Sequence, residues 1–232
     1  MRLNVYIGIA QADEWPQAAS MFAHHSQRFE AASGGVPCLV VPYQHASPML
    51  LDQLAPERVL ISGIAQPFAR YHVQTFLGLN AWLQTTTTPT LAICGGHQLM
   101  AFCFSRDLYA TEHLPDEPMR PLRPDEPINT EASQTQYYTE HGFYPIHLTT
   151  AARTDPLFRA IDSPSYFFEA HSCEVKTLPF DFQVLASTNA CRVQAMRHRT
   201  RPLYGVQFHP EDYTEDLPAG MRLLENFFRL PH

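Results

Sequence analysis

The sequence lacks several features that would assign a protein to a simple functional class. Its first apolar stretch, residues 3–10, is too short to cross a membrane and is followed by Asp13 and Glu14. No Lys/Arg-rich run occurs: the densest basic stretch, residues 197–201, is short and is interpreted as a turn between two strands. The 16 Lys and Arg are outnumbered by 23 Asp and Glu. We therefore expect a cytoplasmic protein that binds neither membranes nor nucleic acid.

Cysteine and histidine usage excludes further classes. Five cysteines is an odd number, and no Cys-x-x-Cys pair occurs, so neither a disulfide framework nor a zinc ribbon is expected. The twelve histidines are scattered, and the adjacent pair His24 and His25 lacks helical ligand spacing. We expect no metal site and no cofactor. An ATP-binding signature is also missing, so any ATP-dependent step would need a separate protein.

One stretch has the pattern of a reactive site. Residues 90–93 predict a buried strand, and residues 97–104 predict a mostly apolar helix. Cys94 lies between them, followed by Gly95 and Gly96, as in a nucleophile elbow, where small neighbours permit a tight strand-to-helix turn. A helix N-terminus at this position would favour the thiolate form of the cysteine. The alternative is a buried cysteine packed beside a Gly-Gly turn.

A second stretch provides partners for such a nucleophile. His209 and Glu211 are two residues apart, so on an extended segment both side chains would point to one side. Pro210 favours that extended conformation at His209. Glu211 could then accept a hydrogen bond from one ring nitrogen of His209, while the other nitrogen takes the proton of Cys94. His-Pro-Glu alone is weak evidence, but together with an elbow cysteine it is specific.

These two stretches resemble the motifs of the class I glutamine amidotransferases. Residues 94–98 are similar to the family's Cys-x-Gly-x-Gln elbow, and residues 209–211 to its distant His-x-Glu. Residues 60–64 look like the strand-end glycine loop of the oxyanion hole, and residues 170–175 like the loop that holds glutamine. The four landmarks occur in the family's order, as in the glutaminase domain of GMP synthetases.

The resemblance implies roles for individual residues. It implies a catalytic triad of Cys94, His209 and Glu211, oxyanion-hole N–H groups at Gly63 or Ile64 and at Gly95, and substrate contacts by Gln98, His171, Ser172 and Cys173. Gln98 could instead cap its helix, and Cys173 could be an inert packed thiol. The chain departs from the family at Ala92, where glycine is usual, and at Ile64, which lies where Gly-Gly-Pro is usual. Ile64 could place a bulky side chain near the pocket mouth.

A strand-helix rhythm predicts an α/β fold. Strands are expected at residues 3–9, 38–42, 58–62 and 90–93, and helices at residues 15–29, 68–83 and 97–104. Such alternation indicates a parallel sheet with helices on both faces, flavodoxin-like by the resemblance, with the site at the carboxyl ends of the strands. Gly63 and Cys94 both follow such ends, so they should be neighbours. Strands expected at residues 142–148, 182–186, 193–196 and 203–207, before a final helix at 221–228, suggest an antiparallel extension. We expect one domain over residues 1–232.

A proline-rich segment, residues 114–129, follows the elbow helix. Its prolines recur at every third residue, which would align them on one ridge of a polyproline II helix. We interpret this segment as an exposed, semi-rigid connector. The alternative is a lid or a docking strip for another protein.

Three functions remain open from the sequence. The first is a stand-alone glutaminase that supplies ammonia from glutamine to a separate ATP-dependent synthetase subunit. The second is a self-sufficient hydrolase that acts on another γ-glutamyl compound, an amine or a peptide. The third, a binding module with a vestigial triad, is disfavoured because Cys94, His209 and Glu211 are all present.

Overall fold

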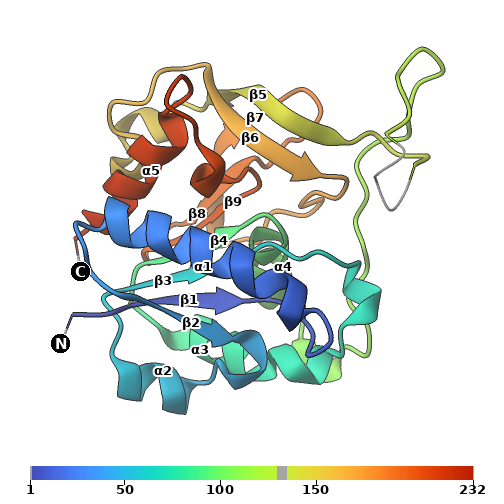
Figure 1. The fold of residues 1–232 in the computed structure, drawn as a ribbon. Helices are drawn as coiled ribbons and strands as arrows, with labels where there is room; N and C mark the ends of the chain where they lie inside the picture. Colours follow the sequence, from blue (N-terminus) through green and yellow to red (C-terminus); the bar gives the residue numbers. More distant parts are fainter. Residues whose placement is uncertain (1, 130–134, 232) are drawn as a thin grey trace.

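A single mixed sheet forms the centre of the computed structural model, which describes residues 2–129 and 135–231. In these residues the strand order is β2-β1-β3-β4-β9-β8-β7-β5-β6 (Figure 1). The strands are β1 (Asn4–Gly8), β2 (Cys38–Pro42), β3 (Arg58–Ile61), β4 (Thr90–Ile93), β5 (Glu140–Leu148), β6 (Ser165–His171), β7 (Phe182–Ser187), β8 (Ala195–His198) and β9 (Leu203–Val206). The α-helices are α1 (Trp15–Ala32), α2 (Pro48–Leu54), α3 (Leu77–Thr85), α4 (Gly95–Ser105) and α5 (Ala219–Phe228).

Strand directions divide the sheet into two parts. Strands β2, β1, β3, β4 and β9 are parallel to one another, in the 2-1-3-4-5 order of flavodoxin-like sheets. Strands β8, β7, β5 and β6 continue the sheet in antiparallel pairs. The predicted fold class, a mostly parallel sheet with helices on both faces and an antiparallel extension, is confirmed.

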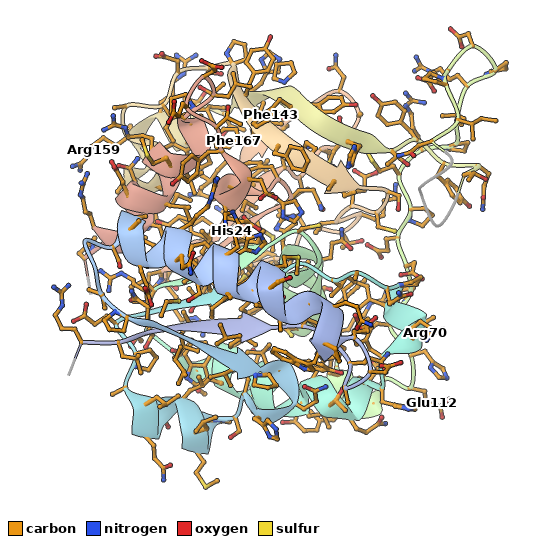
Figure 2. The ribbon with its side chains drawn as sticks, viewed as in Figure 1. His24, Arg70, Glu112, Phe143, Arg159 and Phe167 are labelled. Carbon is orange, nitrogen blue, oxygen red and sulfur yellow. The ribbon has the colours of Figure 1, made fainter. Side chains whose placement is uncertain are left out.

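Successive side chains of the parallel strands enter different cores. Val5 and Ile7 of β1 belong to the core that α2, α3 and α4 cover, whereas Tyr6 belongs to the core beneath α1 and α5. This two-residue period is why the strands are apolar throughout: both faces of the sheet are buried. Figure 1 shows α1 and α5 side by side on one face, and the two helices are in contact. In the same layer Phe167 of β6 is buried (Figure 2) and stacks on Phe208 with ring centroids 4.1 Å apart.

The structure corrects the helix expected at residues 68–83. Only its second half is α-helical, as α3, and the first half contains two 3₁₀ helices, Phe68–Arg70 and Val73–Phe76. Tyr71 and His72 between them have extended backbone. Tertiary contacts explain the interruption, because the amide of Phe68 donates to Asp116 at 2.7 Å and the ring of Tyr71 packs edge-on against Tyr43.

Two elements were missed in the sequence. Helix α2 is short, and its Ser47 cap and Pro48 start lie within a stretch that was not assigned. Strand β6 was also missed, because its end was interpreted as a substrate loop. It pairs with β5 from Glu140↔His171 to Ile146↔Ser165 and forms one edge of the sheet. Strand β8 lies two residues later than expected.

The proline-rich segment projects from the body after α4 (Figure 1). Its base pairs with the chain that follows β6: Pro118 forms an antiparallel bridge with Cys173, and the amide of Met119 donates to the carbonyl of Ser172 at 2.8 Å. The backbone then turns, with Glu126 N donating to Arg123 O at 3.1 Å. The prolines therefore do not form one continuous ridge, contrary to expectation.

No helix within residues 2–129 and 135–231 is both long enough and apolar enough to cross a membrane.

Candidate active site

Cys94 forms a strained turn between β4 and α4. Its backbone has φ of 50° and ψ of −111°, a conformation that is costly for a residue with a side chain. The amide of Cys94 donates to Val206 O of β9 at 2.8 Å, which keeps the turn on the sheet. A Cβ on Gly96 would lie 2.6 Å from the carbonyl oxygen of Ser62, so only glycine fits there. This is the strand-turn-helix geometry of a nucleophile elbow.

The structure brings His209 and Glu211 to this cysteine. Nδ1 of His209 donates to Oε1 of Glu211 at 2.9 Å, so Nε2 remains available to Cys94. Cys94 is among the groups that raise the pKa of His209, so the thiol and the imidazole lie near each other. A Cβ on Gly63 would lie 3.3 Å from Cβ of Cys94 and 3.4 Å from Cε1 of His209, so the backbone of Gly63 lies against both. The expected proximity of Gly63 and Cys94 is confirmed.

The local backbone of this pair differs from the extended segment that we expected. His209 is extended, but residues Pro210–Asp212 form a 3₁₀ helix, whose turn directs Glu211 back toward the imidazole. Arg28 of α1 holds this turn by donating to the carbonyls of Glu211 at 2.6 Å and Tyr213 at 2.8 Å. The His-Pro-Glu geometry thus depends on α1, far away in sequence.

Nearby charges together affect the pKa of His209 more strongly than burial does. Burial alone would lower the pKa of His209, but the Glu211 carboxylate and Cys94 raise it well above its ordinary value. Burial would likewise raise the pKa of Glu211, and the imidazolium of His209 lowers it instead. His209 and Glu211 therefore form an ion pair in which Glu211 is buried and His209 is partly exposed. Burial raises the pKa of the Cys38 and Cys103 thiols to about 12 and that of Cys173 to about 11, which disfavours the thiolate form of these cysteines.

Gly63, Ile64 and Gly95 lie together beside Cys94. A Cβ on Gly95 would lie 2.7 Å from the amide nitrogen of Ile64 and closer still to its side chain. Gly95 is therefore the residue that allows the loop after β3 to approach the start of α4. Two backbone N–H groups from different elements near one nucleophile are the arrangement that binds a developing oxyanion.

Gln98 connects Cys94 to the loop after β6. Its Nε2 donates to the carbonyl of Cys173 at 2.9 Å and to Oε1 of Gln207 at 3.1 Å. Nε2 of Gln207 in turn lies 3.6 Å from Sγ of Cys94. Both of these hydrogen bonds lead out of α4, which favours a positioning role for Gln98 over the capping alternative. Sequence reasoning missed Gln207, although its place at the end of a predicted strand was visible.

His171 is held by two carboxylates instead of facing open solvent. Its Nε2 lies 3.0 Å from Oε2 of Glu140 and 3.2 Å from Oε2 of Glu169, and all three side chains are buried. Burial would lower the pKa of His171, and these carboxylates raise it to about 10. Its Nδ1 donates to the carbonyl of Cys173 at 2.9 Å. His171 therefore holds the loop after β6 through its hydrogen bond to the carbonyl of Cys173. Glu140 and Glu169 were not identified from the sequence.

Two cavities meet at Cys94. The smaller, of about 150 Å³, is lined by Ile64, Ala65, Gln66, Pro67, Cys94, Gly95, Gln98, Asp116, Ala170, His171, Ser172 and Cys173. It contains every predicted substrate residue, together with Asp116, which the sequence did not reveal. The larger, of about 610 Å³, lies on the side of His209 and Glu211, beneath the first half of α1.

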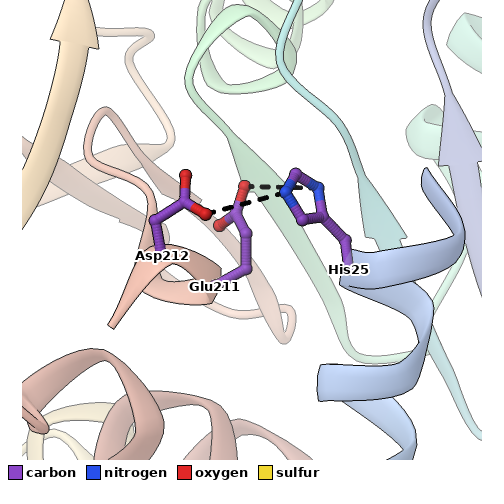
Figure 3. A group of neighbouring side chains, drawn as sticks. All are labelled: His25, Glu211 and Asp212. Carbon is purple, nitrogen blue, oxygen red and sulfur yellow. Dashed lines mark ion pairs between the residues drawn. The ribbon is translucent and has the colours of Figure 1, made fainter. Parts of the chain in front are cut away.

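Two groups of side chains within the described residues have metal-ligand spacing: the His171 group and a group of His25, Glu211 and Asp212. In the second group, shown in Figure 3, His25 lies 3.9 Å from Glu211 and 3.8 Å from Asp212. Tyr6 OH also lies 3.1 Å from Nδ1 of His25. Glu211 of this group is already bonded to His209, and His171 in the other group lies within ion-pair distance of both Glu140 and Glu169.

Comparison with known protein families shows to which family the chain belongs. The family described as "Glutamine amidotransferase class-I" matches residues 22–230. The chain belongs to this family. Among solved structures, the glutaminase domain of Trypanosoma brucei CTPS with bound acivicin has a TM-score of 0.65 at 15% identity, over 96% of this chain and 91% of that one. At this identity the likeness shows the fold alone.

Sequence relatives of this amidotransferase include two proteins that are named as subunits of a glutamine-hydrolyzing GMP synthase. The protein of Methanothermobacter thermautotrophicus is 30% identical over 147 residues, 63% of each chain. That of Methanocaldococcus jannaschii is 31% identical over 155 residues, 66% of this chain and 63% of its own length. The chain thus matches less than two thirds of the length of these relatives.

Proposed function

We propose that this amidotransferase hydrolyses the side-chain amide of glutamine, or of another γ-glutamyl compound, through a γ-glutamyl thioester on Cys94. The observation that carries the proposal is the constellation of an elbow cysteine, a histidine that lies with it against the backbone of Gly63, and a carboxylate 2.9 Å from the far ring nitrogen of that histidine.

The chemistry follows from the geometry. Cys94 Sγ attacks the γ-carbonyl carbon, and the N–H groups of Gly95 and of Gly63 or Ile64 hold the oxyanion, a contact whose loss costs on the order of 10²–10³ in rate. The C–N bond then breaks, and His209 gives its proton to the departing nitrogen. Water hydrolyses the thioester and releases glutamate, while Glu211 keeps the imidazole oriented. The smaller cavity holds the glutamyl group through Gln98 and the loop at residues 171–173.

Two settings for this reaction differ in what happens to the nitrogen. The relatives, whose names describe glutamine-hydrolyzing GMP synthase, support a role as a glutaminase beside a separate synthetase. The size of the larger cavity, about 610 Å³ on the side of His209, favours the other setting, a self-sufficient hydrolase with a larger leaving group.

Trapping the acyl-enzyme tests the common step. Wild-type protein given L-glutamine and hydroxylamine should form γ-glutamyl hydroxamate, and Cys94→Ala should form none. Cys103→Ala is the matched control, since Cys103 lies in the same helix but in the core. Hydroxamate formation by the Cys94→Ala protein would refute the proposal.

A further inference from the structure

The larger cavity begins at the atoms that release the leaving group. Cys94, His209 and Glu211 line it, whereas the smaller cavity contains Cys94 but neither His209 nor Glu211. Because His209 is the proton donor in the proposed reaction, the nitrogen that it protonates must face the larger cavity. The glutamyl group and the leaving group therefore occupy two adjoining spaces that meet at the cysteine.

The size of this space exceeds the requirement of ammonia. Its volume of about 610 Å³ is roughly four times the 150 Å³ of the glutamyl side. Pockets for small organic molecules fall in the range of about 300–1,000 Å³. Ammonia would leave nearly all of the larger cavity unfilled.

The walls restrict the chemistry of an occupant. Apolar side chains from the residues after β1, from α1 and from the loop after β3 form much of the lining, including Ile9, Ala18, Phe22 and Ile64. Asp13 and Glu14 contribute carboxylates, while no Lys or Arg is found among the described residues of the lining. The imidazolium of His209 is the cation among these described lining residues, and it already pairs with Glu211 at 2.9 Å. A carboxylate on the occupant would thus meet the negative charge of Asp13 and Glu14 without a cation of its own to pair it.

We propose that the substrate is a γ-glutamyl amide of an apolar aryl- or alkylamine that carries no carboxylate. This inference rests on the proposed thioester mechanism and adds the leaving-group class to it. Cys94 forms the C–S bond as the C–N bond breaks, the amine takes the proton of His209, and water then converts the thioester to glutamate. The net reaction is amide plus water to glutamate plus amine, with no further reactant.

Steady-state kinetics with three substrates test the inference: L-glutamine, γ-L-glutamyl benzylamide and γ-L-glutamyl-L-glutamate. We expect kcat/KM for the benzylamide to exceed that for glutamine by at least about tenfold, as for other substrate groups that fill an apolar pocket. The dicarboxylic peptide should be the poorest of the three. A benzylamide that is turned over no faster than glutamine, or no faster than the peptide, would overturn the inference.

A pair of variants tests whether the preference for the benzylamide arises in the larger cavity. Ala18→Phe fills the cavity from α1, and Ala23→Phe makes the same change on the exposed part of the same helix, outside the lining. The ratio of kcat/KM for benzylamide over glutamine should fall at least about tenfold in Ala18→Phe and stay unchanged in Ala23→Phe. The ratio corrects for any loss of folded protein. An equal ratio in both variants would overturn the cavity assignment.

The two proposals fail in different ways. Turnover of glutamine or benzylamide by Cys94→Ala would refute the thioester mechanism itself. Cys94-dependent glutamine turnover without benzylamide turnover would leave the mechanism standing and refute only the leaving-group class.

Discussion

A substitution at Glu211 tests most directly how much its negative charge contributes to the reactivity of the proposed triad. The change Glu211→Gln preserves the shape of the side chain and removes its charge. Glu211 is 1% exposed and its Oε1 lies 2.9 Å from Nδ1 of His209. Two unit charges about 4 Å apart in partly shielded protein surroundings attract each other by about 4 kcal/mol. That energy corresponds to about a thousandfold in rate.

We therefore expect kcat/KM for glutamine to fall by about 10²–10³ in Glu211→Gln, because the imidazolium loses its counter-charge while a hydrogen bond to the amide oxygen remains. The pH profile adds a second readout. Glu211 raises the pKa of His209, so its removal should lower that pKa and shift the alkaline limb of kcat/KM to lower pH.

Asp212→Asn is the matched control. Asp212 is the next residue in the same 3₁₀ helix, but its carboxylate lies 3.8 Å from Nε2 of His25 and is partly exposed (Figure 3). Its neutralisation should change kcat/KM by less than about threefold. Equal losses in the two variants, or a Glu211→Gln enzyme with an unshifted alkaline limb, would refute the ion-pair account.

Two further predictions concern stability. Replacing His171 with Gln leaves Glu140 and Glu169 buried without their cation and should cost about 3–5 kcal/mol in urea unfolding at pH 6. Because the folded pKa of His171 is raised from 6.5 to about 10, its stabilisation is complete below pH 6.5 and declines toward pH 10, so the difference from wild type should shrink across that window; a constant difference would contradict this. Gly96→Ala places a Cβ 2.6 Å from Ser62 O and should destabilise by about 1–3 kcal/mol, seen as a lower Tm; an unchanged Tm would mean that the elbow relaxes freely.

The parts of this protein that sequence predicts best are those specified locally. Buried parallel strands are short apolar runs, and the turn at residues 94–96 needs small residues, so both can be recognised from the sequence alone. The pairing of Cys94 with His209 was also predictable, because nucleophile and base require specific residue types. Both lie at the carboxyl ends of adjacent strands, β4 and β9.

Tertiary dependence explains what the sequence could not predict. Asp116 lines the smaller cavity only because the segment after α4 returns to the amide of Phe68. Glu140 reaches His171 through the register of β5 against β6. Glu169 lies two residues before His171 on β6, a strand that was not expected. A buried pair of carboxylates has no sequence motif, because Glu residues are common and only their proximity in the folded protein distinguishes these two.

Ile64 links the departure from the family pattern to substrate choice. Where the family usually has Gly-Gly-Pro, this chain carries a branched side chain that lines both cavities and packs against the position of Gly95. The residue therefore lies at the boundary between the two cavities that we propose for the glutamyl group and the leaving group, and its backbone belongs to the proposed oxyanion loop. An apolar wall at that boundary is compatible with an apolar leaving group and gives a charged one no partner. The same substitution that leaves the triad intact thus bears on which amides can reach it.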